Sequence, residues 1–458
     1  MPRVLVTDAG RGSAIAFIRS LARCGWDVVA AAADPRAAGL HSRYAAERVV
    51  YPSPLRDPDG AVDCLLAAAG ARCVDLIVPV TDDVLLPLVA ARRHLPEGCR
   101  LAAPDSEALE VARDKSRTLE LARSLGVPAP RTTLAAGLAE AVAAAPPLGW
   151  PVVLKPVASR LRVPGRGVAA LSVAYAGDER ELEERWRSLP DGCPVLLQEY
   201  VAGEGHGVEL CLRDGRPLAA FQHRRLREVP TTGGASSFRE SVPLHPEMHA
   251  SSLRLLEALR WTGLAMVEFK LTERGPLLME LNGRVWGSLP LAVKSGVDFP
   301  ALLADLYLPG STNGHGARNG GYRVGVRSRN LRLDVVWIGS VLRGAPSLPG
   351  RAAPRRREAL AAAARLANPR DGYDILSRRL IVRPRESIEW VRRLTEVGIF
   401  AGISSGAILA GAVKAASLID EGTIVMIVCD GGWKYLSAGV WTDDLDVVEA
   451  RAKATIYF

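Results

Sequence analysis

The chain reads Val267-Glu268-Phe269-Lys270 and, a few residues later, Leu277-Leu278-Met279-Glu280-Leu281-Asn282-Gly283-Arg284. Both stretches are typical of β-strands, and the sequence between them predicts a hairpin with its turn at residues 273–276. Side chains two positions apart on a strand point to the same face. Glu280, Asn282 and Arg284 therefore share one face, and Glu268 on the adjacent strand can oppose them.

This combination of side chains favours phosphate and metal chemistry. Carboxylate and amide oxygens are the ligands that Mg²⁺ takes from proteins when phosphates and water complete its shell. An arginine on the same face can stabilise negative charge that develops on those phosphates. A salt-bridged sheet face would explain a Glu and an Arg alone, but it explains less well an amide between them and a second carboxylate across the hairpin.

The stretch from Val267 to Gly287 resembles the metal-binding signature of the ATP-grasp superfamily, in particular its carboxylate–amine ligases related to biotin carboxylase and carbamoyl-phosphate synthetase. The resemblance covers roughly residues 3–385. It implies that Glu268, Glu280 and Asn282 hold one or two Mg²⁺ (or Mn²⁺) ions. It also implies that Arg284 contacts the γ-phosphate of ATP and an acyl phosphate.

The same resemblance assigns the remaining nucleotide contacts. Lys115 and Lys155 match the two phosphate-contacting lysines, and a glycine-containing loop at residues 162–167 would cover the phosphates. Glu199 and the backbone of Val201 would read the adenine edge. His206 stands where relatives place a ribose-binding side chain, although an ordinary loop histidine remains an alternative.

A cluster of cations, Gln222-His223-Arg224-Arg225, precedes a Gly/Ser-rich loop at residues 231–236. Such a pair suits a carboxylate substrate and the phosphoryl group transferred to it, and we expect Arg224 to be the substrate contact. An exposed basic strand with a disordered loop explains the pattern as well. The implied reaction has two steps: a carboxylate is activated by ATP as an acyl phosphate, and an amine, or less favourably a thiol, then displaces phosphate.

The N-terminal segment alternates strand, helix and strand, and predicts a Rossmann-like α/β domain. Gly10 and Gly12 follow its first strand, but Ile15 occupies the third glycine position of the dinucleotide fingerprint, so NAD binding is not expected. The expected fold is mixed α/β and α+β. Its predicted parts are a Rossmann-like domain preceding the ATP-grasp fold, the ATP-grasp domain, an Arg-rich extension of the ligase and a short α/β C-terminal fragment, at residues 1–107, 108–310, 311–385 and 386–458.

Charge is unevenly distributed along the 458 residues. The net charge is +8, and residues 311–385 hold 16 arginines against four acidic side chains, whereas residues 1–310 are balanced. No nucleic-acid-reading motif accompanies this charge, so a nucleic-acid partner is not expected. A solvated basic surface or docking to an anionic partner are the alternatives.

The last 73 residues differ from the rest, with eight isoleucines against six in residues 1–385. The turn Gly402-Ile403-Ser404-Ser405-Gly406, an expected buried strand at residues 424–429 and the loop after it resemble the C-terminal end of cysteine synthases, which use pyridoxal phosphate (PLP). In that family Ser404 would contact the cofactor. Lys414, Lys434 and Lys453 do not match the lysine that binds PLP, so PLP chemistry is not expected. A fusion remnant, a docking module for a cysteine synthase, or half of a shared site are the open alternatives.

The preferred hypothesis is therefore an ATP- and Mg²⁺-dependent ligase that joins a small-molecule carboxylate to an amine. The alternative is a non-catalytic ATP-binding or scaffold protein that docks a cysteine synthase through its C-terminal fragment. Seven scattered cysteines without a CxxC pair, no signal-like N-terminus and no long apolar stretch predict a reduced, cytoplasmic protein without a membrane span.

Overall fold

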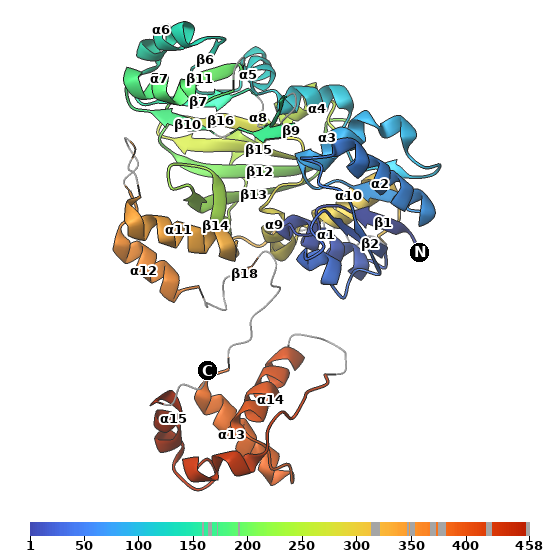
Figure 1. The fold of residues 1–458 in the computed structure, drawn as a ribbon, viewed down its shortest axis with the longest axis vertical. Helices are drawn as coiled ribbons and strands as arrows, with labels where there is room; N and C mark the ends of the chain where they lie inside the picture. The colour runs from blue at the N-terminus through green and yellow to red at the C-terminus, as the bar shows by residue number, and fades with distance from the viewer. Residues whose placement is uncertain are drawn as a thin grey trace. The chain divides into compact units, whose positions relative to one another are not determined.

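The computed structural model describes residues 1–157, 160–163, 167–171, 173–190, 193–312, 321–345, 348, 353–366, 372–373, 382–417 and 424–454. These residues form two compact units, Met1–Ile375 and Leu376–Phe458. Figure 1 labels their helices and strands. No helix within the described ranges is long and apolar enough to cross a membrane.

A five-stranded parallel sheet forms the N-terminal part of the first unit, in the order β3-β2-β1-β4-β5. This confirms the predicted Rossmann-like arrangement. Its strands are β1 (Arg3–Val6), β2 (Asp27–Ala32), β3 (Glu47–Val50), β4 (Leu76–Val78) and β5 (Arg100–Leu101), and its helices are α1 (Gly12–Arg23), α2 (Pro58–Ala71) and α3 (Asp82–Ala90). Strand order reverses between β1 and β4. At such a switch point the loops that leave two neighbouring strands diverge and open a crevice.

Two consecutive helices, α4 (Ser106–Arg113) and α5 (Lys115–Ser124), lead from the parallel sheet to the next sheet in the chain. Asp114 separates them. Its backbone is extended, and its side chain accepts hydrogen bonds from the N–H groups of Ser116 and Arg117, which caps α5. The break therefore places Lys115 at the first position of a new helix rather than in the middle of a long one.

A four-stranded sheet, β10-β7-β11-β6, is followed in the chain by the large sheet that carries the site. The small sheet contains β6 (Thr132–Ala135), β7 (Val152–Pro156), β10 (Ala174–Ala176) and β11 (Val195–Glu199), and α6 (Leu138–Leu148) and α7 (Glu179–Arg187) pack with it. Strands β8 (Arg160–Val163) and β9 (Gly167–Ala170) form a separate antiparallel pair. The predicted phosphate-covering loop joins this pair, and its residues 164–166 lie outside the described residues.

The large sheet has seven strands in the order β16-β15-β12-β13-β14-β17-β18. Figure 1 shows its long central strands crossing the middle of the first unit. The strands are β12 (Glu204–Arg213), β13 (Arg216–Val229), β14 (Ala235–Ser241), β15 (Gly263–Thr272), β16 (Gly275–Asn282), β17 (Arg327–Arg329) and β18 (Gly372–Tyr373). The predicted hairpin is confirmed as β15 and β16. The helices that follow or intervene are α8 (Pro246–Ala258), α9 (Leu289–Ser295), α10 (Phe299–Tyr307), α11 (Leu331–Gly344) and α12 (Arg356–Ala364).

The hydrophobic core of the first unit is shared between the five-stranded parallel sheet and the seven-stranded large sheet. On one side, Leu5 and Leu65 of the N-terminal part belong to the same buried cluster as Trp261 and Leu278. On the other side, Phe17 of α1 is buried in one cluster with Trp286 and Phe299, and the two last rings meet edge to face at 5.2 Å. This continuous burial holds the loops of the parallel sheet against the end of β16.

The second unit is helical. Its core joins α13 (Pro384–Glu396), α14 (Ile403–Ala416) and α15 (Leu445–Ala454) through Ile388, Val391, Leu394 and Val448. The predicted turn at residues 402–406 is instead the first turn of α14, with Gly402 before the helix and Asp430 accepting from the Ser405 N–H and hydroxyl. The buried strand expected at residues 424–429 was wrong: residues 424–429 form no strand, and Val425 and Ile427 are largely exposed. An apolar strand is buried only when neighbouring strands and a covering layer exist, and the described part of this unit supplies helices instead.

Candidate active site

A cavity of about 430 Å³ lies over one face of the large sheet, beside β7 and β11 of the small sheet. Alternation along the strands selects most of the side chains that line it, and Phe269 and Met279, next to a β-bulge, line it as well. From β15 and β16 these include Met266, Glu268, Lys270, Glu280 and Asn282. Every second residue of a strand faces the same side, so the residues that the sequence pattern grouped on one face do meet in one cavity.

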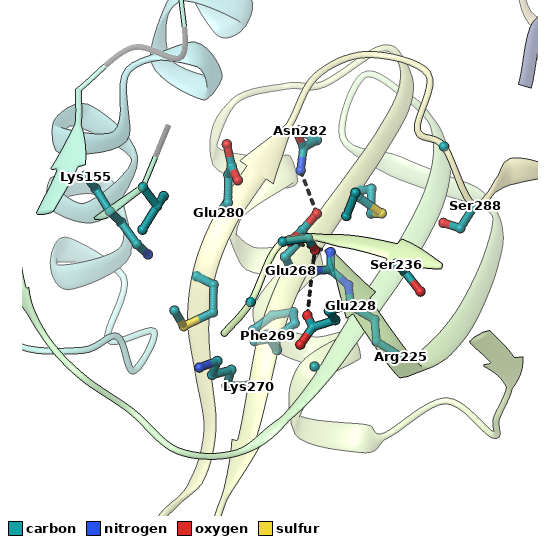
Figure 2. Close-up of a pocket in the computed structure, with 18 of the residues that line it drawn as sticks. Lys155, Arg225, Glu228, Ser236, Glu268, Phe269, Lys270, Glu280, Asn282 and Ser288 are labelled. Carbon is teal, nitrogen blue, oxygen red and sulfur yellow. Dashed lines mark hydrogen bonds and ion pairs between the residues drawn. The ribbon is translucent and has the colours of Figure 1, made fainter. Parts of the chain in front are cut away.

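Glu268 and Glu280 are direct partners in the register of β15 and β16, and Asn282 stands opposite Met266. The Asn282 amide donates to Glu268 at 3.1 Å, as Figure 2 shows. Lys115 lies 3.5 Å from a Glu280 oxygen. The described residues contain no group of three or more His, Cys, Asp or Glu side chains suited to a metal. Two carboxylates and an amide instead fit Mg²⁺, which keeps water and substrate phosphates in its shell.

Arg225 is a site residue that sequence reasoning missed. Its guanidinium lies 2.5 Å from Glu268 and 3.3 Å from Glu228, and Figure 2 shows the three side chains together among the residues that line the cavity. These two carboxylates raise the pKa of Arg225 despite its burial. Arg225 thus neutralises one of the two carboxylates that the sequence placed at the metal end.

The expectation that Arg224 is the substrate contact is corrected by the same alternation. Arg224 lies on the opposite face of β13, where it pairs with Glu240 at 2.7 Å and with Glu204 at 3.5 Å, and it does not line the cavity. Its neighbours His223 and Arg225 do. A run of adjacent polar residues on a strand cannot be assigned to faces until the register is known.

His206 also faces away from the cavity, contrary to its expected ribose contact. It is buried, with Nε2 2.8 Å from Glu204 and Nδ1 3.1 Å from the amide nitrogen of Gln222. In the β12–β13 register His206 stands opposite Arg224. The two residues therefore share the face that the cavity does not use.

Three lysines line the opposite end of the cavity from Ser236 and Ser288, and Figure 2 shows Lys155 and Lys270 there. Burial lowers the pKa of Lys155 to about 8, against the raising influence of Glu280, and the cations Lys115 and Lys270 lower it further. Lys270 donates to the Val201 carbonyl at 2.6 Å and lies 5.2 Å from the centre of the Tyr200 ring. Lys115 and Lys155, which the sequence singled out by resemblance, therefore line one cavity, and Lys270 is a third lysine there.

Glu199 and Val201 line the same end, on and just after β11. The Glu199 carboxylate accepts from the backbone N–H of Arg131 at 3.1 Å and from its guanidinium at 2.8 Å. Burial raises the pKa of Glu199, but these hydrogen bonds outweigh it and hold that pKa below its usual value. This carboxylate is charged and anchored to β6, so it is a fixed acceptor at the cavity edge.

Arg284 follows the end of β16 and lies between cavities. Its Nε donates to Asp82 of α3 at 2.8 Å. An adjoining cavity of about 210 Å³ shares Arg284 and Gly287 with the main cavity and is lined otherwise by Arg11, Ser13, Thr81 and neighbouring residues at the carboxyl ends of β1 and β4. The crevice at the switch point of the parallel sheet thus opens beside the arginine of the sequence motif.

The loop at residues 231–236 contributes Gly233, Gly234, Ala235 and Ser236 to the cavity, next to Asn330 at the start of α11. Gly234 must be glycine here, because a Cβ would lie 2.4 Å from the Val229 carbonyl oxygen. Asn330 belongs to the Arg-rich segment, whose position the sequence did not predict. The side chains of this end are hydroxyls, an amide and arginines.

With this geometry in place, known proteins can be compared. Residues 192–329 match the family described as ATP-grasp in the biosynthetic pathway with Ter operon. The chain is 24% identical over 221 residues to the carbamoyl phosphate synthase large chain of Thermotoga neapolitana, covering 46% of this chain and 19% of that protein. It is 28% identical over 240 residues to the phosphoribosylamine–glycine ligase of Brucella melitensis, covering 48% and 55%.

Among solved structures, the chain resembles the biotin carboxylase–β,γ-ATP complex from Campylobacter jejuni, with a TM-score of 0.56 at 16% identity over 71% of this chain and 74% of that one. At this identity the likeness concerns the fold. The family match concerns residues 192–329, and the solved structure shows a similar fold over 71% of the chain. The chain spans between a fifth and just over half of the length of the two related ligases named above.

Proposed function

We propose that the protein is an ATP- and Mg²⁺-dependent ligase that activates a carboxylate as an acyl phosphate for attack by an amine. The observation that carries the proposal is the pairing of Glu268 with Glu280 on β15 and β16, with Asn282 beside them and Lys115, Lys155 and Arg284 around them in one cavity. Two carboxylates, an amide and three cations are the set that a nucleoside triphosphate and its metal require.

The nucleotide occupies the lysine end in this proposal. Glu199 and the Val201 backbone receive the adenine edge, and Lys115 and Lys155 neutralise the phosphates. Glu268, Glu280 and Asn282 would hold Mg²⁺, and the bound ion would neutralise part of the negative charge of the phosphates. Arg284 then stabilises the charge on the transferred phosphoryl group from the side of the adjoining cavity.

The chemistry follows from that placement. A carboxylate oxygen forms a bond to the γ-phosphorus while the bond to the β-phosphate oxygen breaks, which gives an acyl phosphate and ADP. The amine nitrogen then forms a bond to the acyl carbon, the carbon–oxygen bond to phosphate breaks, and the protons released by the amine go to phosphate and solvent. Positioning and fixed charge carry most of the acceleration in such a transfer.

The test is a screen for ADP release by the purified full-length protein against carboxylates paired with amines. Turnover should require both partners, and Glu280→Gln or Arg284→Ala should remove at least about 99% of it, as expected when a charged contact to the transition state is lost. Arg224→Ala, an arginine paired with glutamates on the other face of the sheet, is the matched control. Near-normal turnover in both site variants, or Mg-ATP binding without turnover throughout the screen, would sink the proposal.

The C-terminal unit calls for a separate experiment. Its resemblance to the end of a cysteine synthase remains a prediction. Four large apolar side chains of this unit are exposed, namely Val425, Ile427, Trp433 and Leu436. They support the idea that another protein segment covers this surface now, or covered it in an ancestral protein. A variant lacking residues 386–458 should keep its ATP-dependent turnover. Co-purification of a cysteine synthase with the full chain and not with the shortened one would favour a docking module over a fusion remnant.

A further inference from the structure

A buried acid–imidazole pair lies beneath the serine end of the main cavity. Nδ1 of His223, on β13, is 2.6 Å from Oε1 of Glu209, on β12, and the side chains are 1% and 0% exposed. The Ser288 hydroxyl donates to the same Glu209 oxygen at 3.2 Å. His223 and Ser288 line the cavity, whereas Glu209 lies behind them. None of the nucleotide or metal roles proposed above uses this pair.

The pair stands in line with the two carboxylates of the metal end. Glu280 pairs with Glu268, Glu268 with Gly207, and Gly207 with His223, in a single row across β16, β15, β12 and β13. Neighbouring strands are about 4.8 Å apart, so the His223 backbone is roughly 10 Å from that of Glu268. Gly207 between them carries no side chain, and a Cβ there would lie 2.5 Å from Cε1 of His223. The absence of a side chain at Gly207 therefore leaves the space that the His223 ring occupies.

Burial decides which partner carries the shared proton. The charged groups that act on both members of the pair are Arg225, Arg239 and Glu268, and Arg225 is itself paired with Glu228 and Glu268. Desolvation is the largest influence: it raises the pKa of Glu209 well above its usual value and lowers the pKa of His223 to about 3. Both shifts favour the uncharged forms of the two groups. In these forms the Glu209 acid donates to Nδ1, and the ring carries its own proton on Nε2.

Nε2 of His223 makes no hydrogen bond to any part of the chain that the structure describes. A neutral N–H in this position is a donor that cannot act as a base at neutral pH, because its lone pair is delocalised in the ring. Donors of this kind stabilise oxygen atoms that carry or develop negative charge. Ser236, Arg239 and Asn330 line the same end of the cavity as His223. Their hydroxyl, guanidinium and amide groups can also donate hydrogen bonds to a negatively charged oxygen.

We infer that His223 is a substrate-contacting residue, whose Nε2–H donates to an oxygen of the carboxylate substrate, and that Glu209 is the positioning residue that fixes this tautomer. The inference rests on the proposed ligase function for the identity of the substrate. The row of paired residues places the contact beyond the metal end, on the side away from Lys155. The carboxylate thus lies between the transferring phosphate and the Glu209–His223 pair.

The first test needs no substrate. Full-length protein labelled with ¹⁵N-histidine reports the tautomer of each ring, and the His223 signals are identified by their loss in His223→Gln. The neutral Nε2–H form should persist from pH 6 to pH 8 and be lost or mixed in Glu209→Ala. An imidazolium, or a ring protonated on Nδ1, would overturn the inference whether or not the ligase substrates are known.

The second test uses the carboxylate and amine that support ADP release by the wild-type protein. His223→Ala should raise the KM for the carboxylate by about ten- to a hundredfold, the range for one lost hydrogen bond to a charged group, and leave the KM for ATP within about twofold. In His223→Gln the amide can itself donate to the carboxylate, and in Glu209→Gln the amide can still donate to Nδ1 of His223. In both variants the KM for the carboxylate should therefore stay much closer to the wild-type value than in His223→Ala.

The control is His206→Gln, which changes a buried histidine paired with a glutamate on the opposite face of the same two strands. It should resemble the wild type. An unchanged carboxylate KM in His223→Ala, or equal losses for carboxylate and ATP, would overturn the contact. If the wild-type protein shows no turnover, that result counts against the proposed function. The tautomer measurement then decides by itself whether Glu209 fixes the Nε2–H form of His223.

Discussion

Arg284, at the end of β16, is held by Asp82, the first residue of α3, through a 2.8 Å hydrogen bond between Nε and Oδ2. The two residues are 202 positions apart in the chain. Burial lowers the pKa of Arg284, but Asp82, together with Glu280 and Glu268, outweighs it and raises that pKa above its usual value. The parallel sheet of the N-terminal part therefore orients the arginine that is proposed to face the transferred phosphoryl group.

Asp82→Asn should lower kcat by about tenfold while the KM for ATP changes little, because a misplaced guanidinium weakens a contact made mainly in the transition state. Steady-state ADP release checks this. Asp34→Asn is the matched control, since Asp34 pairs with Arg36 at 3.1 Å on the exposed surface of the same sheet and exposed pairs contribute little. Equal kcat values for wild type and Asp82→Asn would contradict the coupling.

Nucleotide affinity should depend on the charge of Lys155. Its pKa of about 8 in the free protein lies below the pKa in the complex, because phosphate oxygens favour the ammonium form. ADP affinity should therefore be highest below pH 8 and fall by about tenfold per pH unit above it. Calorimetric titration with ADP in EDTA, from pH 7 to pH 9.5, measures this without a contribution from the metal.

The lysine itself is tested by Lys155→Arg, which keeps its charge throughout that range. The variant should bind ADP with a nearly flat pH profile. A wild-type profile as flat as that of the variant would show that Lys155 is not the titrating group.

Removal of Arg225 should destabilise the fold strongly. The Arg225 side chain is only 14% exposed and pairs with Glu228 and Glu268, which are 9% and 17% exposed. Without it, two shielded carboxylates lose their counter-charge, which costs about 3–5 kcal/mol. Urea unfolding of Arg225→Met measures the loss.

Arg327→Met offers the comparison, since Arg327 pairs with Glu240 at 2.8 Å but is half exposed. Its free energy of unfolding should change by about 1 kcal/mol or less. Similar losses in the two variants would argue against a special role for the shielded pair.

The face assignment along β13 gives a fourth prediction. Arg224→Ala should leave the KM values for ATP and carboxylate within about twofold of wild type, because Arg224 is turned away from the cavity and paired with Glu240 and Glu204. Steady-state kinetics of the variant measures both constants. A tenfold rise in the carboxylate KM would restore the original expectation from the sequence.

Local sequence was sufficient for the hairpin of β15 and β16. Alternation with a period of two put Glu280 and Asn282 on one face. The turn alone would pair Glu268 with Met279, and a β-bulge at this point of the ladder, which the sequence did not predict, pairs it with Glu280 instead. The parallel N-terminal sheet was also predictable, because strand, helix and strand follow one another within 30 residues. Lys115 and Lys155 were identified through resemblance to a family, not through spacing.

Other features depended on long-range packing. The cluster at residues 222–225 contains two residues that face the cavity and two that do not, and only its register with β12 separates them. The apolar pattern around Asp114 is typical of one continuous helix. In the structure the Asp114 side chain caps a new helix, and the pattern is divided into α4 and α5. The apolar run at residues 424–428 is typical of a buried strand, but a strand is buried by its neighbours and not by its own composition.

The sequence by itself indicated the chemistry of Glu268, Glu280, Asn282 and Arg284, because backbone periodicity puts alternate residues of one strand on the same face. The β-bulge that pairs Glu268 with Glu280 appeared only in the structure. The tertiary structure decided what surrounds them. It brought Asp82 from the parallel sheet to Arg284, Arg225 to Glu268, and the Glu209–His223 pair into the same row. Each of these contacts joins separate strands or domains, and burial, which sets the charges of the Glu209–His223 pair, exists only once the sheets have packed together.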